Sequence, residues 1–186
     1  ANLWDEGALR IVEGVGYPNP NRSHFRSIEI WNAGFGADSK ERNGWISSAF
    51  DNGRAPEARV ALGLTLGGDM GPLRGPGQFS ALRDEEAFLA TLENMPNQRH
   101  AVRPDAGSPL DHVLSTYESA QLTGTKISTR LERSAARGLS FPDSALGQQL
   151  RTAARLLEAG VDVPVLKVVQ DGYDTHDNQD GEHAYL

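Results

Sequence analysis

The sequence predicts an α/β protein, with a mostly parallel β-sheet flanked by helices and folded as a single domain over residues 1–186. Apolar segments suited to strands occur at residues 9–15, 60–66 and 161–169, and stretches with helical periodicity lie between them. Strands that alternate with helices in this way are typical of parallel sheets. The length of 186 residues and the hydrophobic content of 38% are sufficient for one substantial core.

The first part of the chain is predicted to form one strand and two helices. Residues 9–15 alternate apolar and polar side chains, as a half-buried strand does. Gly16 and two prolines then end any regular pairing. Apolar residues at helical spacing predict a helix over residues 24–31, and residues 45–50 predict a second, shorter helix after a polar loop.

The second strand, residues 60–66, is apolar enough to be buried on both faces of a parallel sheet. The glycine-rich segment that follows, residues 67–77, lacks the Gly-Lys-Ser/Thr ending of a phosphate-binding P-loop. We interpret this segment as a flexible connection over the sheet edge, with a substrate-covering loop as the alternative.

Helices are predicted for much of the region that follows. Residues 84–95 form the first of these helices. The sequence Ser-Pro-Leu-Asp, which begins at Ser108, is a helix start, with serine as the cap and proline in the first turn. That second helix runs toward Arg137, with a break expected at residues 122–124 because of Gly124.

The last helix and the last strand complete the predicted fold. Asp143 or Ser144 caps a helix that ends at Gly160. The valine-rich residues 161–169 form the third strand. The apolar stripe expected to face the core on this helix consists of Leu146, Leu150, Ala153, Ala154 and Leu157.

The composition excludes several classes of partner. The formal net charge is −7 and the isoelectric point is about 5.2, so no basic surface for nucleic acid or for an anionic membrane is expected. No apolar run approaches the roughly 18 residues of a membrane span. The first residues do not have the basic and apolar pattern of a signal peptide. The chain has no cysteine, which excludes disulfides and thiolate metal sites.

Ser23 is the candidate nucleophile. It lies between the first predicted strand and the helix over residues 24–31. Backbone N–H groups and the helix dipole stabilise an anion at such a position, which suits attack on a phosphate or sulfate ester. The alternative is that Ser23 or Asn21 simply caps the helix.

A second polar cluster follows the third predicted strand, over residues 171–180. Asp174 and His176 are two residues apart, so on an extended segment both side chains point the same way. Carboxylates and imidazoles at the end of a strand are ligands for a divalent metal, and His183 is a further imidazole nearby. The alternative is a solvated acidic loop that caps a helix beginning near Asp180.

Three stretches of the chain resemble the uncharacterised bacterial family called domain of unknown function 1501. The first is Gly-Val-Gly-Tyr-Pro-Asn-Pro-Asn-Arg-Ser-His-Phe-Arg-Ser (residues 14–27), with Ile30-Trp31 and Gly44-Trp45 after it. The second is the helix over residues 146–160. The third is Tyr-Asp-Thr-His-Asp-Asn-Gln (residues 173–179), in which tyrosine replaces the family's tryptophan.

By fold, that family belongs with the alkaline phosphatase and sulfatase superfamily. The resemblance therefore implies an alkaline-phosphatase-like, doubly wound sheet with a two-metal site, whose metal is zinc, or manganese, magnesium or calcium. Ser23 matches the place of the nucleophile, and Asp174 and His176 match metal-ligand positions. The family's first Gly-Gly-Asn-Asp-Gly motif and its last Thr-Asp-His-Gly motif are absent, so the chain resembles an internal piece whose fold is incomplete at both ends.

The resemblance implies a metal-dependent phosphate- or sulfate-ester hydrolase acting on a small-molecule ester. Ser23 would attack the ester, while the helix N–H groups and Arg22 or Arg26 hold the non-bridging oxygens. His24 would orient a neighbour, carry a proton or make a structural contact. The alternatives are a phosphotransferase of the sugar-phosphate mutase type and an exported, non-catalytic binding or structural protein. The family implies a periplasmic or secreted location.

Overall fold

The computed structural model describes residues 3–51, 59–82, 88, 90, 105, 107–131, 139–174 and 177–183. The helix predicted over residues 84–95 therefore lies almost entirely outside the described residues. In chain order the elements are α1 (His24–Ala33), α2 (Trp45–Asp51), β1 (Gly63–Thr65), η1 (Gly71–Leu73), β2 (Phe79–Ala81), α4 (Pro109–Leu131), α5 (Ala145–Glu158), β3 (Val165–Lys167) and α6 (Gln179–His183).

The strands form a small parallel sheet in the order β2-β1-β3. In the central strand, Gly63 is in register with Phe79 on one side and with Val165 on the other. The α/β class and the parallel pairing are thus confirmed, although the sheet is smaller than the apolar segments predicted. β2 was not predicted, because it follows the glycine-rich segment directly and is only three residues long.

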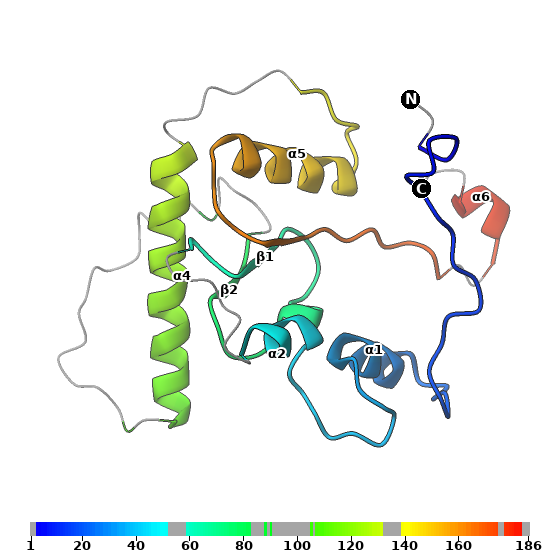
Figure 1. Ribbon diagram of the computed structural model, residues 1–186, viewed down its shortest axis with the longest axis horizontal. Helices are drawn as coiled ribbons and strands as arrows, with labels where there is room; N and C mark the ends of the chain where they lie inside the picture. Colours follow the sequence, from blue (N-terminus) through cyan, green and yellow to red (C-terminus); the bar gives the residue numbers. More distant parts are fainter. Residues whose placement is uncertain are drawn as a thin grey trace.

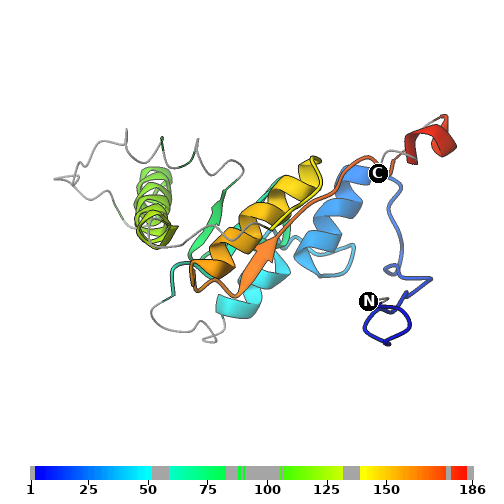
Figure 2. The same ribbon diagram turned by 90° about the horizontal axis from the view of Figure 1, so that it is seen from above.

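Helices cover both faces of this sheet. In Figure 1, α5 lies on one side of the sheet, α1 and α2 lie on the other, and α4 stands beside β2; Figure 2 shows the same arrangement from above. β1 is buried along its whole length, as a central strand should be. The core around β1 includes Leu64, Ile127 and Leu156, which come from β1, α4 and α5.

Residues 9–15 do not form the predicted strand. They have no regular secondary structure, and Leu9, Ile11, Val12 and Val15 are between 49% and 73% exposed. Figure 1 shows this dark-blue segment at the edge of the molecule, away from the sheet. Alternation gives a segment a suitable face, but a strand also needs a neighbour for its backbone N–H and C=O groups, and no described segment supplies one.

The break predicted at residues 122–124 is also wrong, because α4 is continuous. Thr123 and Gly124 are buried, and the Thr123 hydroxyl lies 3.5 Å from the carbonyl oxygen of Val60. Thr123 thus contacts the chain just before β1, and the helix continues through the buried Gly124. In the part of the chain that the structure describes, no helix is long and apolar enough to cross a membrane.

α5 has the predicted boundaries, and its predicted stripe is buried only in part: Ala153 packs against the core, whereas Leu150 is exposed. The Ser144 hydroxyl accepts a hydrogen bond from the Gly147 N–H at 3.1 Å, which confirms Ser144 as the cap. Leu156 is only 1% exposed, whereas Leu157, assigned to the buried stripe, is 63% exposed. The side chain of Gln149 bonds to the Val169 backbone beyond β3, which ties α5 to the end of that strand.

Candidate functional site

Ser23 is the N-cap of α1. Its φ and ψ are −77° and 119°, and its hydroxyl accepts a hydrogen bond from the Arg26 N–H at 3.4 Å. The Ser23 N–H in turn donates to the side-chain oxygen of Asn21 at 2.8 Å. The capping interpretation is therefore confirmed. The serine is exposed and its capping bond is long, so the hydroxyl is open to solvent at the positive end of the helix.

A closed ring of hydrogen bonds holds the loop before Ser23 against α1. The Asn21 N–H donates to the Tyr17 hydroxyl at 2.8 Å, and the Ser27 hydroxyl donates to the Asn21 carbonyl at 2.8 Å. The Tyr17 and Ser27 hydroxyls are 2.9 Å apart. Since the Ser27 proton is used by Asn21, Tyr17 donates to Ser27. This ring fixes the approach of the chain to Ser23.

Arg26 holds the loop that follows α1. Its guanidinium donates to the carbonyl oxygens of Ala37 at 3.0 Å and Ser39 at 2.9 Å, and pairs with Glu29 at 3.1 Å. The Arg26 guanidinium, which the sequence analysis assigned to substrate binding, is thus already bonded to three acceptors. The other two assigned side chains, Arg22 and His24, are exposed on either side of Ser23.

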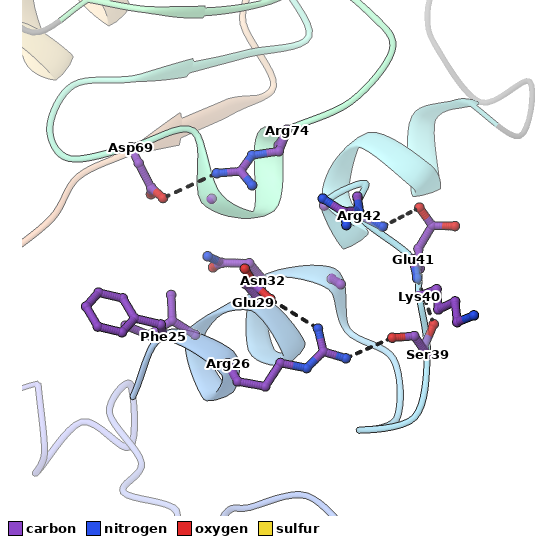
Figure 3. A pocket seen from close by; sticks show the side chains of 14 residues that line it. Phe25, Arg26, Glu29, Asn32, Ser39, Lys40, Glu41, Arg42, Asp69 and Arg74 are labelled. Carbon is purple, nitrogen blue, oxygen red and sulfur yellow. Dashed lines mark hydrogen bonds and ion pairs between the residues drawn. The ribbon is translucent and has the colours of Figure 1, made fainter. Parts of the chain in front are cut away.

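A pocket of about 540 Å³ lies between α1, the loop after it and the connection from β1 to β2 (Figure 3). The α1 wall consists of Phe25, Arg26, Ile28, Glu29, Asn32 and Ala33. The opposite walls consist of Ser39, Lys40, Glu41, Arg42, Gly44, Asp69, Gly71 and Arg74. Neither Ser23 nor Asp174 is among the lining residues, so the structure does not bring these two side chains together in this pocket.

Close backbone contacts set the shape of the pocket. The Gly44 N–H donates to the Arg74 carbonyl at 2.6 Å, and a Cβ atom on Gly44 would lie 2.1 Å from the Pro72 carbonyl oxygen. Gly71 has a φ of +47°, which favours glycine. The side-chain oxygens of Asn32 and Asp69 each lie 3.2 Å from the place of a Cβ on Gly71. Glycines are thus required where the walls meet.

The lining carries more positive than negative groups. Four cationic side chains, Arg26, Lys40, Arg42 and Arg74, face three carboxylates, Glu29, Glu41 and Asp69. The pocket therefore has a net formal charge of +1 in a chain whose net charge is −7. A local excess of positive charge attracts anions and raises their concentration near the pocket.

The exits of β1 and β3 meet beside this pocket. Lys167, the last residue of β3, donates to the Asp69 carbonyl at 2.7 Å, and its ammonium group lies 3.7 Å from the Asp69 carboxylate. Arg74 approaches the same carboxylate at 3.8 Å. Asp69, which follows the second predicted strand, is therefore flanked by two cations and lies in the pocket wall.

The second predicted cluster is only partly visible. Asp174 is exposed on the segment after β3, and His176 lies outside the described residues. α6 begins at Gln179, which agrees with the helix expected near Asp180. No group of three or more His, Cys, Asp or Glu side chains that suits a metal occurs within the described ranges. The described part of the chain does not by itself provide the ligand set of the predicted two-metal site.

Sequence reasoning did not find Arg42 and Arg74. They are far apart in the chain, and each stands in a polar or glycine-rich loop without a recognisable motif. One signal could have indicated a binding residue: Arg74 lies in a glycine-rich loop shortly after a strand predicted to be buried.

Comparison of the chain with protein-family models, with curated proteins and with solved structures finds no match. The family resemblance of the sequence motifs thus stays a prediction. The function has to be argued from the residues and their geometry.

Proposed function

We propose that this chain is part of a hydrolase for phosphate or sulfate esters, with an alkaline-phosphatase-like fold and with Ser23 as the nucleophile. The observation that carries the proposal is the exposed Ser23 hydroxyl at the N-terminus of α1, a helix whose next turn lines a positively charged pocket. The parallel sheet is compatible with this fold, of which it would be a part.

In the proposed reaction the Ser23 oxygen attacks phosphorus or sulfur, and the bond from that atom to the ester oxygen breaks. The alcohol leaves with a proton, and the proton of Ser23 passes to a base or to water. Water then attacks the covalent intermediate and releases phosphate or sulfate. The free N–H groups of the first turn and the exposed Arg22 guanidinium stabilise the charge on the non-bridging oxygens. Because Arg26 is already bonded to two loop carbonyls, its role is to hold the pocket wall.

The proposal includes a divalent metal, with Asp174 and His176 among its ligands. A carboxylate and an imidazole are suitable donors for zinc or manganese, but the described residues supply too few ligands for a complete centre. No step above therefore depends on the metal. From the family resemblance we also propose a periplasmic or secreted location.

The test is the turnover of 4-nitrophenyl phosphate and 4-nitrophenyl sulfate by a complete protein that contains this chain, with zinc, manganese, magnesium or calcium added. Turnover should be abolished in Ser23→Ala and unchanged in Ser115→Ala, which alters an exposed serine on α4. Phosphate trapped on the peptide that contains Ser23, detected by mass spectrometry, would support the covalent step. A complete wild-type protein that is inactive with all four metals, or a Ser23→Ala variant that is equally active, would refute the proposal.

A non-catalytic binding protein is the second candidate. It is favoured by the capping role of Ser23 and by the absence of Ser23 from the pocket lining. A chain that binds anionic esters without turning them over would establish this alternative.

A further inference from the structure

The pocket beside α1 is a preformed cavity whose walls come from separate parts of the chain. The Arg26 guanidinium fixes the loop after α1 through the carbonyls of Ala37 and Ser39. The Gly44 N–H fixes the end of that loop to the carbonyl of Arg74. A site held by such contacts loses little entropy when a ligand binds.

The carboxylates of this pocket already have partners. Glu29 pairs with Arg26 at 3.1 Å. Glu41 accepts the N–H groups of Arg42 at 2.9 Å and of Asn43 at 2.8 Å. Asp69 is flanked by Lys167 and Arg74. A cation would therefore have to displace existing donors, whereas an anion would compete only with the 3.8 Å approach of Arg74 to Asp69.

Two guanidinium groups remain available to a ligand. Within the described residues, the side chain of Arg42 makes no hydrogen bond or ion pair, and that of Arg74 makes only its 3.8 Å approach to Asp69. Figure 3 shows both arginines on the walls across the pocket from α1, with Asn32 and Glu29 facing them. Guanidinium groups bind phosphate, sulfate and carboxylate oxygens through two parallel hydrogen bonds.

The other end of the pocket is apolar. Phe25 is 84% exposed and Ile28 is 55% exposed, although both are large hydrophobic side chains. Figure 3 places Phe25 at the opposite end of the pocket from Arg42. An organic group packed against these two side chains would remove apolar surface from water, which inorganic phosphate alone cannot do.

We propose that this pocket binds an organic phosphate, with the phosphate between Arg42 and Arg74 and the organic group against Phe25 and Ile28. The inference does not depend on the proposed hydrolysis, because Ser23 is not part of the pocket lining. It assigns a binding site to two loops, the one after α1 and the connection from β1 to β2.

The test measures binding of phenylphosphonate, which cannot be hydrolysed, to the full chain by titration calorimetry. Binding should weaken by about fivefold or more in Arg42→Gln and in Arg74→Gln, since each variant loses one charged hydrogen-bond donor at an exposed site. Arg151→Gln, which alters an exposed arginine on α5, is the matched control and should bind as the wild type does. Ser23→Ala should also bind normally, even if it abolishes turnover.

Two further ligands separate the parts of the proposal. Inorganic phosphate and benzyl alcohol should each bind at least about tenfold more weakly than phenylphosphonate, because each lacks one half of the recognised ligand. Circular dichroism of the arginine variants checks that they remain folded. Absence of phenylphosphonate binding, or equal weakening in Arg151→Gln and the two pocket variants, would overturn the inference. Loss of binding in Phe25→Ser alone, with both arginine variants unchanged, would overturn the placement of the phosphate.

Discussion

Replacing Gln149 with leucine should destabilise the fold at the end of β3. The Gln149 side-chain oxygen accepts the Val169 N–H at 2.7 Å, and its amide nitrogen donates to the Val169 carbonyl at 2.8 Å. This side chain therefore acts as a neighbouring strand would, at a point two residues beyond β3. Leucine has a similar volume and favours helix, so the change removes both hydrogen bonds with little effect on α5 itself.

The size of the effect follows from the burial of these groups. Gln149 and Val169 are both half-buried, so after the substitution water reaches the Val169 N–H and C=O only in part. Each lost hydrogen bond to a partly buried backbone group costs about 1 kcal/mol, which gives a loss of about 2 kcal/mol in the free energy of unfolding. For a chain of this length that loss lowers the melting temperature by about 4–8 °C.

Thermal and urea unfolding followed by far-ultraviolet circular dichroism would measure the change. Gln148→Leu is the matched control, because it alters the adjacent, exposed glutamine, whose side chain donates one hydrogen bond within the described residues, to the Asp143 carboxylate at 3.3 Å. We expect the control to differ from the wild type by less than about 0.5 kcal/mol. Equal stability of the two variants would show that the Gln149 bonds do not support the strand end.

Two further substitutions test the walls of the pocket. Gly44→Ala should lower the free energy of unfolding by about 1–3 kcal/mol, because its Cβ would lie 2.1 Å from the Pro72 carbonyl oxygen. Gly36→Ala is the control, since a Cβ on Gly36 would have no atom within 4 Å. Equal urea midpoints for the two variants would contradict the close approach at Gly44. Arg26→Met should release the loop after α1 and raise the rate of tryptic cleavage after Lys40 by about fivefold, from the loss of about 1 kcal/mol of local stability. An unchanged cleavage rate, followed by mass spectrometry, would show that Arg26 does not hold the loop.

Much of the local structure was predictable from the sequence. The position of α1 followed from helical spacing, and the limits of α5 followed from Ser144 and Gly160, because caps and turns depend on hydrogen bonds and φ angles within a few residues. The central strand β1 followed from its apolar run. The N-cap interpretation of Ser23 was correct for the same local reason. The nucleophilic role of Ser23 and the metal-binding roles of Asp174 and His176 stay predictions.

Other features depended on partners far along the chain. Residues 9–15 alternate as a strand does, but pairing requires a second strand, and alternation does not supply it. The buried face of α5 includes Leu156 and carries Gln149, whose side chain bonds to Val169, so it is not simply the strongest apolar stripe. The missing strand and the buried face of α5 both depend on contacts between elements, and the periodicity of a sequence does not encode such contacts.

The sequence by itself determined the α/β class, most helix boundaries and the position of Ser23 at a helix start, since these follow from periodicity and capping over a few residues. The tertiary structure alone decided that Arg42 and Arg74 line one pocket. They come together because Gly44 has no side chain and its N–H reaches the Arg74 carbonyl at 2.6 Å. A contact between two backbone segments leaves no pattern in the sequence beyond a glycine. Only the folded chain therefore reveals that this contact brings the two arginines together.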